Sequence, residues 1–219
     1  MEIPHDTRIR TVEELEARRV EMFALADILE RERIPFFICF GVLLGAVREK
    51  GFIPWDWDVE LFVYTKDVLP QAEKLMELFR DAGFEIIRAD LSPDNFKIDV
   101  FKKGTDPVVN SYTVVGWYKE DDVWKRRTLR IPARFFDSLD EIEFLGRTFK
   151  CPHDPVGYLE YQYGKDWRTP KRSSDPEQYW TREAFAIERA LGNAGNGFEA
   201  AFRALKGVIR RALKRAGLR

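Results

Sequence analysis

Two acidic residues on one predicted strand constrain this chain more than any other feature. Asp58 and Glu60 alternate with the apolar residues Val59 and Leu61, at the start of a stretch rich in β-branched and aromatic side chains. Side chains alternate along a strand, so both carboxylates share one face, with Cα atoms about 6.5–7 Å apart. The apolar neighbours predict a mostly buried strand, where unpaired acids are costly. The alternative is that Asp58 and Glu60 are solvent-facing acids of an edge strand. The apolar neighbours favour a functional pair instead.

A glycine turn and a short predicted helix, 41–49, come before this strand. The amino end of such a helix can present backbone N–H groups to a phosphate. Asp58 and Glu60 can hold one or two Mg²⁺ ions, which would bridge the phosphates of a nucleotide. Asp99, on the predicted strand 96–102, adds a third carboxylate. It can serve as a ligand of a second metal or as the base that takes a proton from an attacking hydroxyl.

The order of predicted elements favours an α+β fold with a mixed sheet. A capping box of Thr11 and Glu14 starts the first helix, and Gly83 follows the third at the C′ position. The predicted helices are 11–33, 41–49, 66–82, 155–163, 175–191 and 198–218. The predicted strands are 36–40, 59–64, 84–89, 96–102, 111–118, 126–131 and 141–149. We expect a catalytic domain over 1–191, a flexible break at 192–197 and a helical appendage over 198–219.

Length and composition exclude several classes of protein. The chain has 219 residues, 45% of them hydrophobic, which is enough for a sizeable core and argues against global disorder. Its 36 basic and 37 acidic residues nearly cancel, so we expect no nucleic-acid partner. Two cysteines cannot build a disulfide framework. We also expect no signal peptide and no membrane-spanning segment, and a cytoplasmic location.

The basic residues gather at the carboxyl end of the chain. Residues 200–219 contain seven Lys and Arg and no Asp or Glu, so this segment carries +7 and residues 1–199 carry −8. On a helical wheel, Phe198, Phe202, Leu205 and Ile209 fall on one side and most of the cations on the other. Such a helix can lie on an anionic membrane, here the inner face, or pack on the acidic body. Both alternatives stay open.

Two blocks of sequence resemble the LicD family of phosphotransferases, which belongs to the nucleotidyltransferase-fold superfamily. The first is Gly-Val-Leu-Leu-Gly-Ala-Val-Arg at 41–48, followed by Phe-Ile-Pro-Trp-Asp-Trp-Asp-Val-Glu at 52–60. The second is Pro-His-Asp at 152–154, Tyr-Leu at 158–159, and Tyr-Gly-Lys-Asp-Trp-Arg-Thr-Pro at 163–170. The resemblance covers roughly residues 20–171 and implies a nucleotidyltransferase-like mixed sheet flanked by helices.

The resemblance further implies a metal-dependent transferase that uses Mg²⁺, with Mn²⁺ as the alternative ion. Members move a phosphorylated small alcohol, such as phosphocholine or ribitol phosphate, from a CDP-linked donor to a glycan or lipid-linked glycan. The family's metal carboxylates correspond to Asp58, Glu60 and Asp99, which also carry the catalytic role. Donor binding is assigned to Gly41, Val42, Gly45, Arg48 and Trp57.

Three departures from the family pattern concern the choice of substrate more than catalysis. Val42 replaces the usual Thr and removes a hydroxyl that could contact phosphate, Trp57 stands where many members have an acid, and Glu60 is one methylene longer than Asp. Individual residues also have alternative roles. Arg48 can pair with a donor phosphate or serve as a helix-end cation beside Asp56. Trp57 can stack on a ligand or anchor the core.

Two other functions remain open at this point. A nucleotidyltransferase would move a nucleoside monophosphate from an NTP to a small molecule, and the carboxylate motif is common to both reactions. A degenerate, non-catalytic binding module is the other alternative, although three acids at ligand spacing argue against it.

Overall fold

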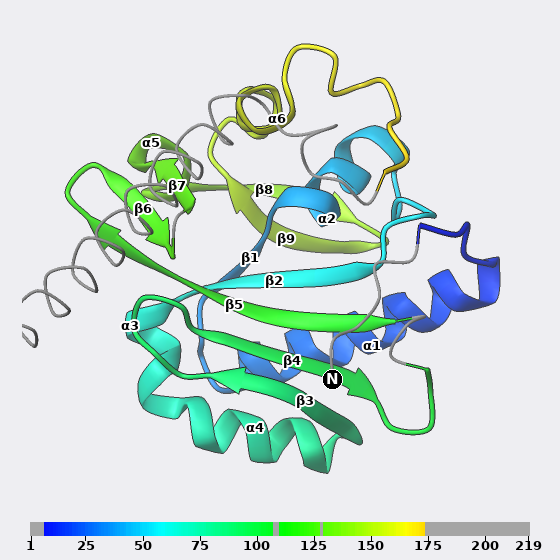
Figure 1. Ribbon diagram of the computed structural model, residues 1–219, viewed down its shortest axis with the longest axis vertical. Coiled ribbons are helices and arrows are strands. Elements are labelled where there is room, and N and C mark those ends of the chain that lie inside the picture. The colour runs from blue at the N-terminus through cyan, green and yellow to red at the C-terminus, as the bar shows by residue number, and fades with distance from the viewer. Residues whose placement is uncertain (1–6, 107–109, 128, 174–219) are drawn as a thin grey trace, which may run out of the picture.

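The computed structural model describes residues 7–106, 110–127 and 129–173, and these form a mixed sheet with helices on both faces (Figure 1). The main sheet has the strand order β1-β2-β5-β4-β3, and β6 and β7 extend it from one end of β5. Strand β2 is parallel to β5, and the other neighbours are antiparallel. The predicted α+β fold with a mixed sheet is confirmed.

The strands of the main sheet are β1 (Phe36–Ile38), β2 (Asp58–Tyr64), β3 (Phe84–Asp90), β4 (Lys97–Lys102), β5 (Ser111–Glu120), β6 (Val123–Arg126) and β7 (Leu129–Pro132). A separate hairpin contains β8 (Leu139–Phe144) and β9 (Arg147–Pro152). The α-helices are α1 (Val12–Arg31), α2 (Phe40–Leu44), α3 (Thr65–Val68), α4 (Ala72–Asp81), α5 (Ala133–Phe136) and α6 (Pro155–Tyr163). A π-helix, η1 (Gly45–Glu49), continues α2, and a 3₁₀ turn, η2 (Leu69–Gln71), joins α3 to α4.

The alternation of side chains along β2 and β5 decides which face of the sheet holds the acids. Tyr112 on β5 donates a hydrogen bond of 2.7 Å to Glu21 of α1, so α1 covers the face to which Tyr112 belongs. Phe62 is on the opposite face, where its ring lies 5.4 Å from that of Phe40 on α2. Asp58 and Glu60 share the alternation of Phe62, so they project toward α2 and not into the α1 interface.

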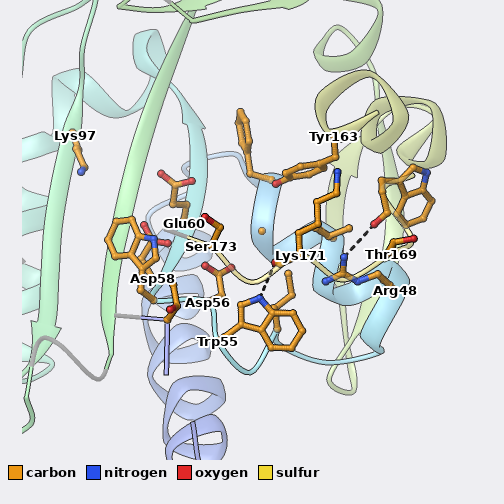
Figure 2. A pocket seen from close by; sticks show the side chains of 17 residues that line it. Arg48, Trp55, Asp56, Asp58, Glu60, Lys97, Tyr163, Thr169, Lys171 and Ser173 are labelled. Atoms are coloured by element: carbon orange, nitrogen blue, oxygen red, sulfur yellow. Dashed lines mark hydrogen bonds between the residues drawn. The ribbon is translucent and has the colours of Figure 1, made fainter. Parts of the chain in front are cut away.

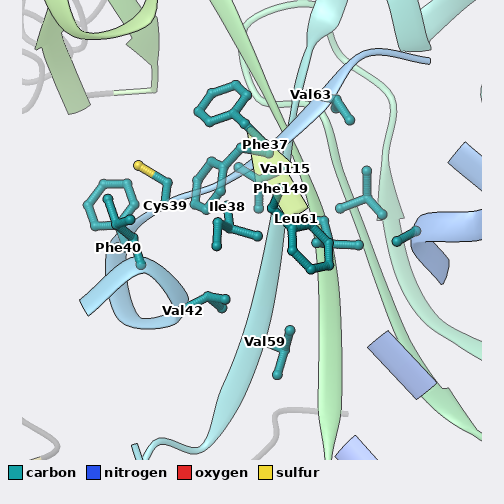
Figure 3. Close-up of a cluster of buried hydrophobic side chains, with 14 of the residues drawn as sticks. Phe37, Ile38, Cys39, Phe40, Val42, Val59, Leu61, Val63, Val115 and Phe149 are labelled. Carbon is teal, nitrogen blue, oxygen red and sulfur yellow. The ribbon is translucent and has the colours of Figure 1, made fainter. Parts of the chain in front are cut away.

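The core is apolar and surrounds β1 and β2 (Figure 3). Val59, Leu61, Val63 and Cys39 are essentially inaccessible to solvent. Burial raises the pKa of the Cys39 thiol well above its ordinary value. The strand that carries the acids of β2 is therefore packed against the core through its apolar residues.

Several predicted elements are confirmed. Thr11 and Glu14 form both bonds of the capping box at the start of α1. Gly83 has φ +81° at the predicted C′ position of α4, after the C-cap residue Ala82. Helix α6 has the predicted bounds, and Gly164 (φ +87°) follows its last residue.

Other predicted bounds were wrong because turns interrupt the pattern. The single strands predicted at 126–131 and 141–149 are hairpins, which reverse beside Arg127 and at Leu145-Gly146, all with positive φ. The helix predicted at 66–82 is divided near Pro70, whose ring removes a backbone donor. Helix α2 begins at Phe40, so Gly41 lies inside it and not in a preceding turn.

The elements predicted at 175–191, 192–197 and 198–218 lie outside the described residues, and the proposed membrane contact of that segment stays a prediction. In the part of the chain that the structure describes, no helix combines the length and apolar character needed to cross a membrane.

Candidate active site

A pocket of about 260 Å³ opens on the α2 face of the sheet, directly over the acids of β2 (Figure 2). Its walls come from α2 and η1, the loop 53–57, β2, β4 and the segment after α6. The lining residues are Thr7, Phe40, Gly41, Leu44, Arg48, Ile53, Trp55, Asp56, Trp57, Asp58, Glu60, Lys97, Tyr163, Trp167, Thr169, Lys171 and Ser173. Both blocks of sequence singled out above therefore contribute to one pocket.

Three acids line this pocket, one more than the sequence motif suggested for β2. Asp56 precedes Asp58 and Glu60 at the same two-residue spacing, and all three are half-buried. The Asp-Trp-Asp-Val-Glu alternation was the signal that could have identified Asp56 beforehand.

Burial makes the charged forms of these acids costly and raises all three carboxyl pKa values. The pKa of Asp58 rises furthest, first through burial and then through repulsion by Glu60 and Asp56. Burial also raises the pKa of Glu60 and of Asp56, although Arg126 and Arg18 respectively oppose the effect. The pocket is therefore electrostatically suited to a cation.

Glycines let the loop that carries Asp56 approach α2 and η1. A Cβ atom on Gly41 would overlap the Asp56 carboxylate, and one on Gly45 would lie 2.5 Å from the carbonyl oxygen of Gly51. Gly41 lines the pocket, whereas Gly45 is buried behind it. The glycines thus serve close packing between helix and loop.

The residues predicted to bind the donor divide into two groups. Gly41, Arg48 and Trp57 line the pocket. Val42 is 3% exposed and lies among the core side chains (Figure 3), and Gly45 does not line the pocket either. The Thr-to-Val departure therefore falls on a core position.

Arg18 anchors the acidic loop from beneath, and sequence reasoning missed it. Its side chain is fully buried, and it donates to the backbone oxygen of Asp56 (2.8 Å) and to Oδ1 of Asn110 (3.0 Å). Burial lowers the pKa of Arg18, and Asp56 is the charge that most opposes this. Arg18 precedes Met22 and Leu25 by four and seven residues on the buried face of α1, and a basic residue at that spacing was a readable signal.

The segment after α6 forms the opposite wall and is tied to the first block. Arg48 donates to the backbone oxygen of Trp167 at 3.1 Å and pairs with Glu49 at 2.7 Å. The indole nitrogen of Trp55 donates to the backbone oxygen of Lys171, also at 3.1 Å. These bonds hold the two walls of the pocket together. They also mean that Arg48 has partners within the protein in addition to any ligand that it binds.

Asp99 lies on the same face but two strands from Glu60. Thr113 of β5 is in register with both Glu60 and Asp99 and donates to Oδ1 of Asp99 at 2.8 Å. Arg88 donates twice to the other oxygen, and Lys97 pairs with Oδ1 at 2.9 Å. Asp99 is not among the residues that line the pocket, and its assignment as third metal ligand or base stays a prediction.

Across residues 7–106, 110–127 and 129–173, no three acidic, histidine or cysteine side chains converge closely enough to hold a metal ion by themselves. The donor set nevertheless suits Mg²⁺, which is commonly held by one or two carboxylates together with substrate phosphates. Asp58 and Glu60 would supply the carboxylates of such a site, and their assignment as metal ligands stays a prediction.

Comparison with known proteins places the chain in a family. The family model described as LicD/FKTN/FKRP, nucleotidyltransferase domain, matches residues 33–154, which is more than half of the chain. The chain belongs to this family. The matched range includes β2 with its acids and Asp99.

Two curated relatives and one solved structure are among the proteins to which the chain is similar. Ribitol-5-phosphate transferase FKTN of Mus musculus is 26% identical over 166 residues, 72% of this chain and 35% of that protein. Lipopolysaccharide cholinephosphotransferase LicD of Haemophilus influenzae is 43% identical over 37 residues, 17% of this chain and 14% of that protein. The solution structure of the antibiotic-resistance factor ANT(2'')-Ia aligns with a TM-score of 0.49 at 13% identity, covering 92% of this chain and 99% of that one. The chain thus spans about a third of the length of FKTN.

Proposed function

We propose that this chain is a metal-dependent phosphotransferase that moves a phosphorylated small alcohol from a CDP-linked donor to a glycan hydroxyl. The observation that carries the proposal is the row of acids Asp56, Asp58 and Glu60 in one pocket, whose raised pKa values suit a bound cation. Family membership and the names of the relatives, which transfer ribitol 5-phosphate or phosphocholine groups, support the choice of alcohol.

The reaction follows from the groups that meet in the pocket. The acceptor oxygen attacks the phosphorus that bears the alcohol, the bond from that phosphorus to the bridging oxygen breaks, and CMP leaves. Asp58 and Glu60 would hold Mg²⁺ or Mn²⁺, and the metal, when bound, offsets the charge on the pyrophosphate. Asp56 stays oriented through the loop that Arg18 anchors. The acceptor's proton would pass to a carboxylate. Asp99, which lies outside the pocket lining but pairs with Lys97 of the lining, is the candidate.

The proposed function is tested with the full chain, Mg²⁺, and CDP-ribitol or CDP-choline, by following the release of CMP. Asp58→Asn and Glu60→Gln should each lower turnover by orders of magnitude, because either change removes a charged ligand. Glu143→Gln is the matched control, since Glu143 is an exposed acid on β8 and does not line the pocket. It should keep the wild-type rate.

The same experiment separates the alternative reaction. A nucleotidyltransferase would ignore CDP-alcohols and release pyrophosphate from an NTP in the presence of a small acceptor. Near-normal CMP release by both Asp58→Asn and Glu60→Gln would show that the acids do not hold the metal. Full activity of the wild type in excess EDTA would contradict metal dependence.

A further inference from the structure

Cations gather at the end of the acidic row that faces β4. Lys97, on the first residue of β4, lines the pocket, and Figure 2 shows it across β5 from Asp58 and Glu60. Its ammonium group pairs with Oδ1 of Asp99 at 2.9 Å, and its side chain is only 22% exposed. A lysine held in a pocket wall by a single carboxylate is well placed to bind an anion.

Asp99 does not depend on Lys97 for its own position. Thr113 donates to one oxygen of Asp99, and the guanidinium of Arg88 donates twice to the other at 3.0 and 2.8 Å. Asp99 therefore remains fixed and compensated if the Lys97 ammonium turns toward a ligand. The arrangement makes Asp99 a positioning residue for Lys97.

Arg126 supplies a second cation from the end of β6. Its Nε atom is buried from solvent, and no acceptor among the described residues bonds to it. Burial lowers the pKa of Arg126, and Glu60 is the charge that most opposes this. Burial raises the pKa of Glu60, and Arg126 is the charge that most opposes that change. Arg126 does not line the pocket, but the preceding residue, Lys125, is in register with Tyr118 of β5. Side-chain alternation therefore places Arg126 on the face of the sheet that carries Thr113 and Glu60.

The other two cations among the described lining residues, Arg48 and Lys171, belong to the wall made by η1 and the segment after α6, and not to the β4 side. Arg48 is bonded to the backbone of Trp167 and to Glu49, and Lys171 pairs with Asp166 at 2.9 Å. A row of acids by itself repels a phosphate, and fixed positive groups near Glu60 would reduce this repulsion in addition to a bound metal. Ammonium and guanidinium groups are the usual protein ligands of phosphate oxygens.

We propose that Lys97, in the lining of the pocket, and Arg126, beside it on the same face of the sheet, form an anion-binding wall that takes a phosphate group of the substrate on the β4 side of Glu60. The identity of the substrate in this proposal rests on the proposed function, whereas the binding of a phosphate group to Lys97 and Arg126 does not. The wall would hold the donor's pyrophosphate on the side of the pocket away from Arg48.

The test uses the full chain with inorganic pyrophosphate and Mg²⁺ in a calorimeter, and a CDP-alcohol in the CMP-release assay. Lys97→Met and Arg126→Gln should each weaken pyrophosphate binding and raise KM about tenfold, since a hydrogen bond to a charged group contributes on that scale. Lys97→Arg and Arg126→Lys keep the charge and should recover much of the affinity. Lys103→Met, an exposed lysine just beyond the far end of β4, is the matched control and should behave as the wild type.

Two outcomes distinguish this wall from the proposed function. If no CDP-alcohol is turned over, yet pyrophosphate binding falls in Lys97→Met and Arg126→Gln alone, the phosphotransferase assignment fails and the wall stands. If the wild type turns over a CDP-alcohol while both variants, folded by near-ultraviolet circular dichroism, keep wild-type KM and pyrophosphate affinity, the wall is refuted and the function stands. Equal loss in Lys103→Met would also refute it, because only the total charge would then matter.

Discussion

Replacing Gly45 with alanine tests the close contact between η1 and the acidic loop. The new Cβ atom would lie 2.5 Å from the carbonyl oxygen of Gly51 and 3.3 Å from the backbone nitrogen of Ile53. Both are backbone atoms, so the loop itself must move. The Gly51 N–H bond to the Gly45 oxygen, already 3.4 Å long, would lengthen further.

The expected loss follows from two opposing contributions. Crowding a packed site costs about 1–3 kcal/mol, and alanine regains about 0.5–1 kcal/mol over glycine within a helix. We therefore expect Gly45→Ala to lower the free energy of unfolding by about 1–2 kcal/mol, which lowers Tm by about 2–8 °C in a protein of this size.

Gly51→Ala is the matched control, because it makes the same substitution on the other side of the contact. Its Cβ would meet only Leu145 Cδ2, at 4.0 Å, and Gly51 does not have the positive φ that favours glycine. We expect no loss, and a gain of up to about 0.4–1 kcal/mol from the stiffer unfolded chain. Urea and thermal unfolding of the three proteins measure both effects. A Gly45→Ala protein as stable as the wild type, or an equal loss in Gly51→Ala, would refute the crowding argument.

Three further predictions test the electrostatics of the site and the start of α1. In EDTA, Asp58→Asn should unfold at the same or a higher temperature than the wild type, because it removes a charge that burial, Glu60 and Asp56 disfavour. Added Mg²⁺ should raise the Tm of the wild type but not that of the variant. A variant with a lower Tm than the wild type in EDTA would contradict the argument that the Asp58 charge is destabilising. Arg18→Met should lower the free energy of unfolding in urea by at least about 1–3 kcal/mol, since it leaves the backbone oxygen of Asp56 and the side-chain oxygen of Asn110 unpaired. An unchanged midpoint of urea unfolding would show that Arg18 does not anchor the loop. The hydrogen bonds from Arg8 lower the pKa of Glu14 to about 2. Glu14→Gln should therefore lower the free energy of unfolding near pH 7 by up to about 1 kcal/mol. That loss should shrink as the pH falls from 4.5 toward 2, because wild-type Glu14 is then protonated too; a difference independent of pH would point to the capping geometry instead.

Local patterns in the sequence were sufficient for the elements whose cause is local. The capping box at Thr11, the glycine after α4 and the bounds of α6 depend on residues a few positions apart, so they can be read without a partner. The alternation of Asp58 and Glu60 predicted that both acids share a face of β2, and the structure brings both to one pocket. The hairpins at 126–131 and 141–149 were missed because strand propensity continues across both turns. No glycine marks the positive φ of Arg127, whereas Gly146, beside Leu145, was a readable turn signal.

The tertiary structure alone decided which distant groups meet these acids. The register of β2, β5 and β4 placed Thr113 between Glu60 and Asp99. That register depends on pairing between residues far apart in sequence, since Glu60 and Thr113 are separated by 53 positions and Asp99 and Thr113 by 14. Arg18 from α1, Lys97 from β4 and Arg126 from β6 reach the site for the same reason. A sequence pattern fixes the direction of a side chain along its own strand or helix, whereas the charge that compensates a buried carboxylate is supplied by whichever element packs against it.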